Sequence, residues 1–138
     1  MAKKKILIVD DDPDVRAGLN IRLRANGYDT AFAADALTAV LEARKYSPDL
    51  IVLDLGLPAG DGFVVMQRLR MIPALAIIPV IVLSARDRES NENRVAMAGA
   101  VAFLQKPFDD VALLKAIREA LGEEPPSTER RRRATDPD

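Results

Sequence analysis

The sequence contains no cysteine and no histidine. The absence of cysteine excludes disulfide bonds, thiolate metal sites and cysteine nucleophiles. The absence of histidine removes the commonest general base and the commonest ligand of transition metals. Any chemistry that this chain performs must therefore use carboxylates, hydroxyls, lysines and arginines.

An excess of charge of one sign and long apolar segments are missing as well. The chain has 20 Lys and Arg against 21 Asp and Glu, so no overall field indicates a nucleic-acid or membrane partner. Residues 3–5 are lysines followed by a short apolar run, but this run is too short for a signal peptide. No window approaches transmembrane length. We expect a soluble, cytoplasmic protein.

Short, continuous apolar runs rich in branched residues are what the sequence does contain. With 138 residues, 49% of them apolar, the chain can bury one core and carry a modest tail. Runs of this kind are typical of strands buried on both faces, as in a parallel sheet covered by helices. The three strong strand candidates are residues 6–9, 50–53 and 80–83, and the two weaker ones are residues 28–33 and 101–104.

Segments with helical periodicity fill the gaps between these strands. The segment 13–25 alternates like a strand, but Asp12-Pro13 at its start and Gly27 after its end predict a helix. The segment 89–98 is the weakest helix, because its first half is wholly polar, and we expect it to be the least stable part of the fold. The other predicted helices are residues 36–44 after Asp35, residues 63–70, and residues 110–121 ending at Gly122.

The order of these elements is strand then helix, repeated five times. This alternation predicts an α/β fold with a doubly wound five-stranded parallel sheet and with helices on both faces. We expect the flavodoxin-like strand order 2-1-3-4-5. We expect this domain to span residues 1–122. Residues 123–138 have no apolar periodicity and contain four consecutive arginines, which predicts a disordered tail or a charged linker.

Polar side chains follow four of the predicted strands. In an open α/β sheet, ligands bind beyond the carboxyl ends of the strands, so these side chains should meet at one edge. Asp12 should mainly cap the helix that begins there. The residues at these strand ends are Asp10-Asp11-Asp12, Asp54, Ser84 and Lys106-Pro107.

This set of groups has a chemical logic. Clustered carboxylates repel one another and need a cation, and a set of oxygen ligands favours Mg²⁺. A carboxylate beside such a metal can attack phosphorus and form an acyl phosphate. A lysine and a hydroxyl can hold the remaining phosphoryl oxygens.

The sequence resembles the receiver domains of bacterial two-component response regulators over about residues 4–122. Each motif is weak alone, but the four together, in this order and at these intervals, are very specific. The segments that carry the resemblance are Ile8-Val9-Asp10-Asp11-Asp12-Pro13, then Leu53-Asp54-Leu55-Gly56-Leu57-Pro58 with Asp61-Gly62, then Leu83-Ser84-Ala85, and finally Lys106-Pro107-Phe108.

The resemblance implies a role for each site residue. Asp54 would accept the phosphoryl group. Asp11 would bind Mg²⁺ directly, Asp10 would help through water, and the backbone carbonyl of Gly56 would complete the metal site.

The resemblance also implies a switch on the far side of the phosphoryl group. Ser84 would move toward that group and Lys106 would bind it, and the bond before Pro107 would be cis. Phe103 would change rotamer when Ser84 moves, although a core aromatic residue without a switching role is an equally good interpretation.

Partners follow from the same resemblance. A histidine kinase or a phosphotransfer protein would supply the phosphoryl group, because this chain has no histidine. The face made by the fourth helix, fifth strand and fifth helix would contact a downstream protein, or an output domain missing from this sequence, and could pair two copies of the chain. We expect no direct nucleic-acid or membrane partner and no enzymatic activity.

Two positions depart from the usual pattern. Gly56, two residues after Asp54, has no side chain to place near an attacking water, and Arg86, two residues after Ser84, could reach over the pocket. In the family these positions influence how long the phosphoryl group lasts.

Three alternatives remain open at this stage. A phosphatase that works through an aspartyl phosphate usually needs a second Asp where this chain has Gly56. A flavodoxin-like cofactor module needs a phosphate-binding loop where this chain has three aspartates. The chain could also be the front of a longer protein, since its end faintly resembles the run into a diguanylate cyclase domain.

Overall fold

A five-stranded parallel sheet forms the centre of the molecule. The computed structural model describes residues 3–57, 62–85 and 88–123. The strand order is β2-β1-β3-β4-β5, which confirms the predicted topology. The strands are β1 (Lys5–Val9), β2 (Asp29–Ala33), β3 (Leu50–Leu53), β4 (Val80–Ser84) and β5 (Ala102–Gln105).

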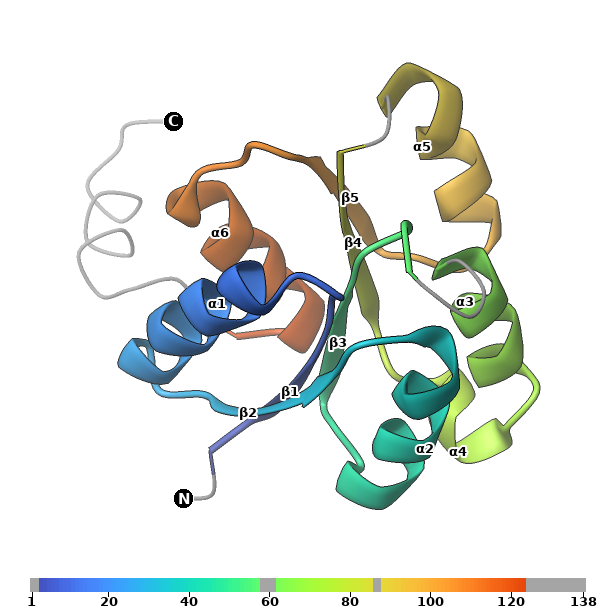
Figure 1. Cartoon of the computed structure of the whole chain (residues 1–138), viewed down its shortest axis with the longest axis horizontal. Helices are drawn as coiled ribbons and strands as arrows, with labels where there is room; N and C mark the ends of the chain where they lie inside the picture. The colour runs from blue at the N-terminus through green and yellow to red at the C-terminus, as the bar shows by residue number, and fades with distance from the viewer. Residues whose placement is uncertain (1–2, 58–61, 86–87, 124–138) are drawn as a thin grey trace, which may run out of the picture.

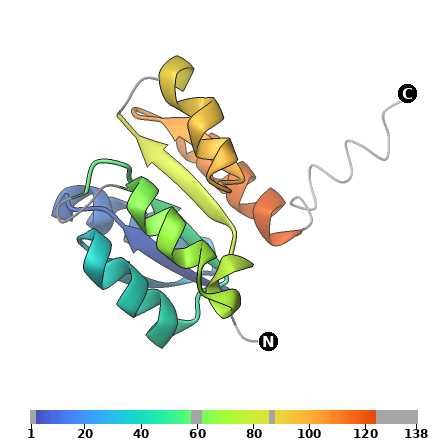
Figure 2. The ribbon, with the colours of Figure 1, turned by 90° about the vertical axis from the view of Figure 1, so that its right-hand side faces the viewer.

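Helices cover both faces of this sheet. In Figure 1, α1 and α6 lie on one side of the strands, and α2, α3, α4 and α5 lie on the other; Figure 2 shows the molecule turned by 90°. The helices are α1 (Pro13–Ala25), α2 (Ala36–Tyr46), α3 (Gly62–Arg70), α4 (Pro73–Ala76), α5 (Arg88–Met97) and α6 (Asp110–Leu121).

The alternation of side chains along each strand explains why the strands are apolar throughout. Leu7 and Val9 belong to the core on the α2–α5 side, whereas Ile6 and Ile8 belong to the core against α1 and α6. Because successive strand residues point to opposite faces, a sheet covered on both sides needs apolar residues at every position. All four of these β1 side chains are at most 1% exposed.

The helix boundaries follow from local capping chemistry. The carboxylate of Asp12 accepts a hydrogen bond from the Asp14 N–H, and that of Asp109 accepts one from Ala112. Such side-chain acceptors satisfy N–H groups that lack a partner within the helix. Gly122 ends α6 in the left-handed conformation, with φ of 70°. The predicted helix over residues 13–25 is therefore confirmed.

One element differs from the expectation of five helices. The short helix α4 follows α3 after a two-residue turn, with Pro73 at its first position. Four residues are too few to show a helical period, so no sequence pattern predicts this turn. The helices expected fourth and fifth along the chain are consequently α5 and α6.

No helix in the described part of the chain is long and apolar enough to cross a membrane. The predicted tail begins at Glu123, and its residues 124–138 lie outside the described residues.

Candidate functional site

The first two carboxylates of the site follow neighbouring parallel strands. Val9 and Leu53 are register partners in β1 and β3, so Asp10 and Asp54 come next to each other just beyond the sheet. The Asp54 N–H donates to the Val9 carbonyl at 2.9 Å, and the Asp10 N–H donates to the Ala33 carbonyl at 3.1 Å. Backbone hydrogen bonds therefore hold both residues in position.

A cluster of three carboxylates forms at this edge. Asp10, Asp11 and Asp54 each offer one oxygen, and the three oxygens lie within 4.8 Å of one another. Opposite ligands of a bound Mg²⁺ are about 4.2 Å apart, so small side-chain movements would bring all three oxygens to one ion. Asp10 is buried and Asp11 is exposed. The donor set fits a hard divalent cation that enters from solvent.

Lys106, which directly follows β5, supplies a positive charge to the site. Its ammonium lies 2.9 Å from the Asp10 carboxylate and 3.8 Å from that of Asp54. The Lys106 N–H donates to the Ser84 carbonyl at 2.8 Å, which links the end of β5 to the end of β4. The bond between Lys106 and Pro107 is cis, in agreement with the expectation from the sequence.

The surroundings of Asp54 act on its protonation in both directions. Burial raises the pKa of this carboxyl above its usual value and is the largest effect. The nearby Lys106 ammonium lowers the pKa, as does the Gly56 N–H, which donates to the carboxylate at 3.3 Å. Asp10 and Asp11 raise the pKa further. The attraction of a bound divalent cation would offset the effects of burial and of the neighbouring carboxylates, and would favour the ionised form of Asp54.

Two of the predicted switch residues lie on the β4–β5 side of the site. Ser84 ends β4 and is 1% exposed. Phe103, in the middle of β5, pairs with Val82 and is 7% exposed, within the core on the α2–α5 side. Gly56 is exposed, and Arg86 lies outside the described residues.

The structure adds two hydrogen bonds and one close approach of the backbone that the sequence did not suggest. The Arg16 guanidinium donates to the Asp10 carbonyl at 2.8 Å, and the Asp12 N–H donates to the Asp10 carboxylate at 2.9 Å. A Cβ on Gly62 would lie 2.8 Å from the carbonyl oxygen of Asp54. Gly62 belongs to a segment that carries the resemblance, but only the packing reveals that a side chain does not fit there.

Comparison with known proteins agrees with this arrangement. The family model described as a response regulator receiver domain matches residues 6–118. The transcriptional regulator RpaA of Synechocystis is 41% identical over 117 residues, which cover 85% of this chain and 48% of RpaA. The regulatory protein KdpE of Escherichia coli is 42% identical over 116 residues, which cover 84% of this chain and 50% of KdpE. The chain thus spans about half the length of these curated relatives.

A solved structure with a similar fold contains a magnesium ion. It is the receiver domain of sensor histidine kinase PA1611 from Pseudomonas aeruginosa, with a TM-score of 0.81 and 29% identity. The match covers 88% of this chain and 100% of that one. That structure has a magnesium ion coordinated in its active site cleft.

Proposed function

The chain belongs to the response regulator receiver family, and from this premise we propose that it is a phosphorylation switch in which Asp54 accepts the phosphoryl group. The observation that carries the proposal is the meeting of three carboxylates and one ammonium where the strands end. Asp54 is the member of this group that contacts Lys106 and is also partly accessible, with its side chain 13% exposed.

We assign Asp10, Asp11, Asp54 and the carbonyl of Gly56 as the residues that would hold Mg²⁺. When bound, such an ion neutralises charge on a phosphoryl group as it is transferred. The carboxylates support this assignment, because their oxygens are close together and oxygen ligands suit this ion. Asp10 already has Lys106 and the Asp12 N–H as partners, so it suits an indirect role through water.

In the transfer step, an Asp54 carboxylate oxygen would form a bond to phosphorus. The bond from phosphorus to the imidazole nitrogen of the donor would break, and its electron pair would return to the imidazole. Lys106 is placed to bind a phosphoryl oxygen, because its ammonium is 3.8 Å from Asp54. The hydroxyl of Ser84 would move toward the phosphoryl group and bind another of its oxygens. Phe103 would change rotamer when Ser84 moves.

The output of the switch would be the face formed by α5, β5 and α6. In these labels it corresponds to the fourth helix, fifth strand and fifth helix of the sequence analysis. Its partner would be a downstream protein, an output domain or a second copy of the chain. A cytoplasmic histidine kinase or phosphotransfer protein would be the phosphoryl donor. We further propose that residues 1–122 form the receiver and that residues 123–138 are a tail or linker.

A phosphorylation assay tests this function directly. The purified chain is incubated with acetyl phosphate, with and without Mg²⁺, and its intact mass is measured. We expect one added phosphoryl group that requires Mg²⁺ and is lost in Asp54→Asn. Asp14→Asn is a matched control, because Asp14 is an exposed carboxylate in the first turn of α1 outside the cluster, and it should leave labelling unchanged. Labelling that survives Asp54→Asn, or that needs no metal, contradicts the assignment.

A further inference from the structure

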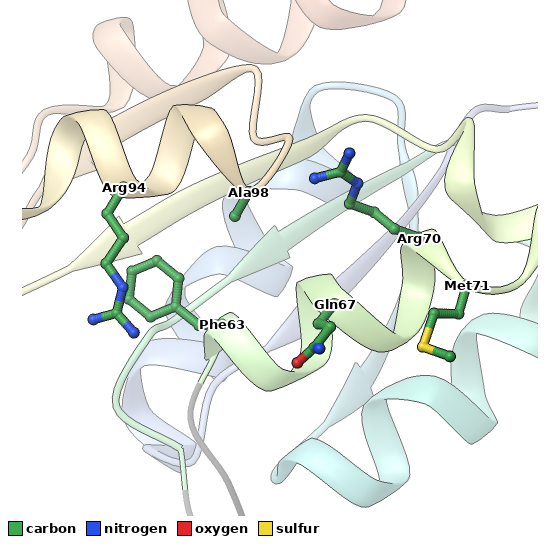
Figure 3. A pocket seen from close by; sticks show the side chains of 6 residues that line it. All are labelled: Phe63, Gln67, Arg70, Met71, Arg94 and Ala98. Atoms are coloured by element: carbon green, nitrogen blue, oxygen red, sulfur yellow. The ribbon is translucent and has the colours of Figure 1, made fainter.

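An open groove lies between α3 and α5, on the α2–α5 side of the sheet. Its volume is about 550 Å³, which is in the range of ligand sites. Figure 3 shows six lining side chains on the two facing helices and the turns that follow them. They are Phe63, Gln67, Arg70 and Met71 on one wall and Arg94 and Ala98 on the other, and none of them belongs to the carboxylate cluster.

The wall formed by α3 is a regular stripe. Residues 63, 67, 70 and 71 recur at helical spacing, so they line one side of the helix over about 10 Å. Phe63 stands at one end of this stripe, and Met71 stands at the other, where it is 76% exposed. The stripe therefore has apolar groups at its two ends, with Gln67 and Arg70 between them. This elongated surface suits an extended or helical segment better than a compact small molecule.

Two guanidinium groups are held at the two ends of the groove. The Arg94 guanidinium carbon lies 3.7 Å from the centre of the Phe63 ring, a stacking contact that engages its flat face. Arg70 donates through Nη1 to the Met97 carbonyl at 3.2 Å. Both contacts connect α3 with the α5 side, and they orient the cations before any ligand arrives. Groups ordered in advance lose less conformational entropy on binding.

The charge of the groove defines what it can accept. Among the residues that the structure describes, its lining contains two arginines and no carboxylate. The α3 segment itself has no Asp or Glu, and it carries Arg68 besides Arg70. A complementary ligand has carboxylates at both ends and an apolar side chain between them. An isolated small anion would leave the apolar surface between the arginines uncovered.

We propose that this groove is a docking site for an acidic amphipathic helix of a partner protein. Two carboxylates of that helix, about two turns apart, would bind Arg70 and Arg94. An apolar side chain between them would contact Phe63 and Ala98. Helices that lay an apolar face into a groove are an established mode of peptide recognition. The site goes beyond the proposed phosphorylation switch and does not depend on it.

The test is a titration of the ¹⁵N-labelled chain with a synthetic helical peptide, followed by NMR at low salt. The peptide carries two glutamates seven residues apart and leucines between them. We expect saturable shift changes confined to α3, α5 and the turns after them. Arg70→Gln and Arg94→Gln should each weaken binding about tenfold, the scale of one charge-assisted contact. A peptide with lysines in place of glutamates should not bind.

Arg68→Gln is the matched control variant, because it removes the same charge from the same helix at an exposed position outside the groove lining. It should leave the affinity unchanged, and circular dichroism should show all three variants folded at the temperature of the titration. Equal weakening by Arg68→Gln would show nonspecific attraction and overturn the proposal. Shift changes elsewhere, absence of saturation, or the same changes with citrate alone would overturn it too.

Discussion

At the scale of single residues, Gly62 shows how tightly the site is built. Its position against the Asp54 carbonyl leaves no room for a Cβ, which would also lie 2.8 Å from the Leu55 Cα. Both of these atoms belong to the backbone, so they cannot move aside as a flexible side chain could. The Gly62 N–H donates to the Leu55 carbonyl at 2.8 Å, which fixes the start of α3 behind the site.

We therefore predict that Gly62→Ala lowers the free energy of unfolding by about 1–3 kcal/mol, the usual cost of inserting a group into packed structure. The same variant should be phosphorylated more slowly, because the Asp54 backbone must shift. Gly18→Ala is the control: nothing lies within 4 Å of its added Cβ, and it should stabilise α1 by roughly 0.5–1 kcal/mol. Urea denaturation measures both. A Gly62→Ala variant as stable as the original chain would show that the site is not packed this closely.

Another residue-scale prediction concerns pH. The buried Tyr28 hydroxyl donates to the Glu123 carboxylate at 2.7 Å, and burial, then Glu123, raises the pKa of Tyr28 above its usual range. The unfolded chain releases this proton near pH 10, while the folded chain keeps it. Its contribution to stability is thus complete below about pH 10 and is lost as the pH rises further.

Tyr28→Phe should therefore lose less stability than the original chain as the pH rises from about 10 to about 12. Denaturant unfolding at several pH values in this range measures the difference. Tyr46→Phe serves as a comparison, since burial is also the largest cause of the raised pKa of Tyr46, but the next cause is the charge of Asp29 and not a hydrogen bond to a carboxylate. Parallel stability curves for Tyr28→Phe and the original chain would refute the effect.

Several of these residues could be predicted from the sequence and others could not. Asp10, Asp54 and Lys106 could be brought together because the carboxyl ends of parallel strands share one edge of the sheet. The contact of Tyr28 with Glu123 joins residues 95 positions apart, and no local pattern predicts it. The sequence does not predict the role of Gly62 either, because this role depends on how closely α3 approaches the Asp54 carbonyl.

At the scale of elements, the sheet was more predictable than the helices around it. The continuous apolar runs predicted β1, β3 and β4 within one residue at each end. The alternation in α1 indicated a strand, and only the caps at its ends corrected that interpretation. The short helix α4 has neither length nor period, so it could only be found in the structure.

The polar helix α5 gives a prediction at this scale. Among its residues 91–97, only Val95 is buried, whereas α6 buries Leu113 and Ile117. A helix with fewer buried contacts opens at lower free energy. We predict that amide hydrogens of α5 exchange faster than those of α6 and of α1, which buries Leu19 and Leu23. Native-state hydrogen exchange measures this order. Equal protection in α5 and α6 would contradict it.

At the scale of the whole molecule, the carboxylate cluster couples metal binding to stability. A ligand that binds only the folded chain adds about 2.7 kcal/mol at 100 times its dissociation constant. Because the three carboxylates cluster only in the folded chain, we predict that Mg²⁺ raises the melting temperature. NaCl at equal ionic strength should give a much smaller rise.

Asp11→Asn should remove most of this Mg²⁺ response, because it deletes one ligand of the cluster. Asp11 is exposed, so the substitution should change the stability without metal little. Thermal unfolding followed by circular dichroism, with and without Mg²⁺, measures both quantities. A full response in Asp11→Asn would place the ion elsewhere.

The ion pair between Lys106 and Asp10 joins residues 96 positions apart, near the two ends of the folded domain. Its two partners follow the first and the last strand of the sheet. During synthesis on the ribosome, the aspartates therefore emerge long before the lysine. A nascent or truncated chain that lacks β5 has the acceptor without its lysine. The ion pair, and with it the competence to carry a signal, is thus acquired only when the domain is complete.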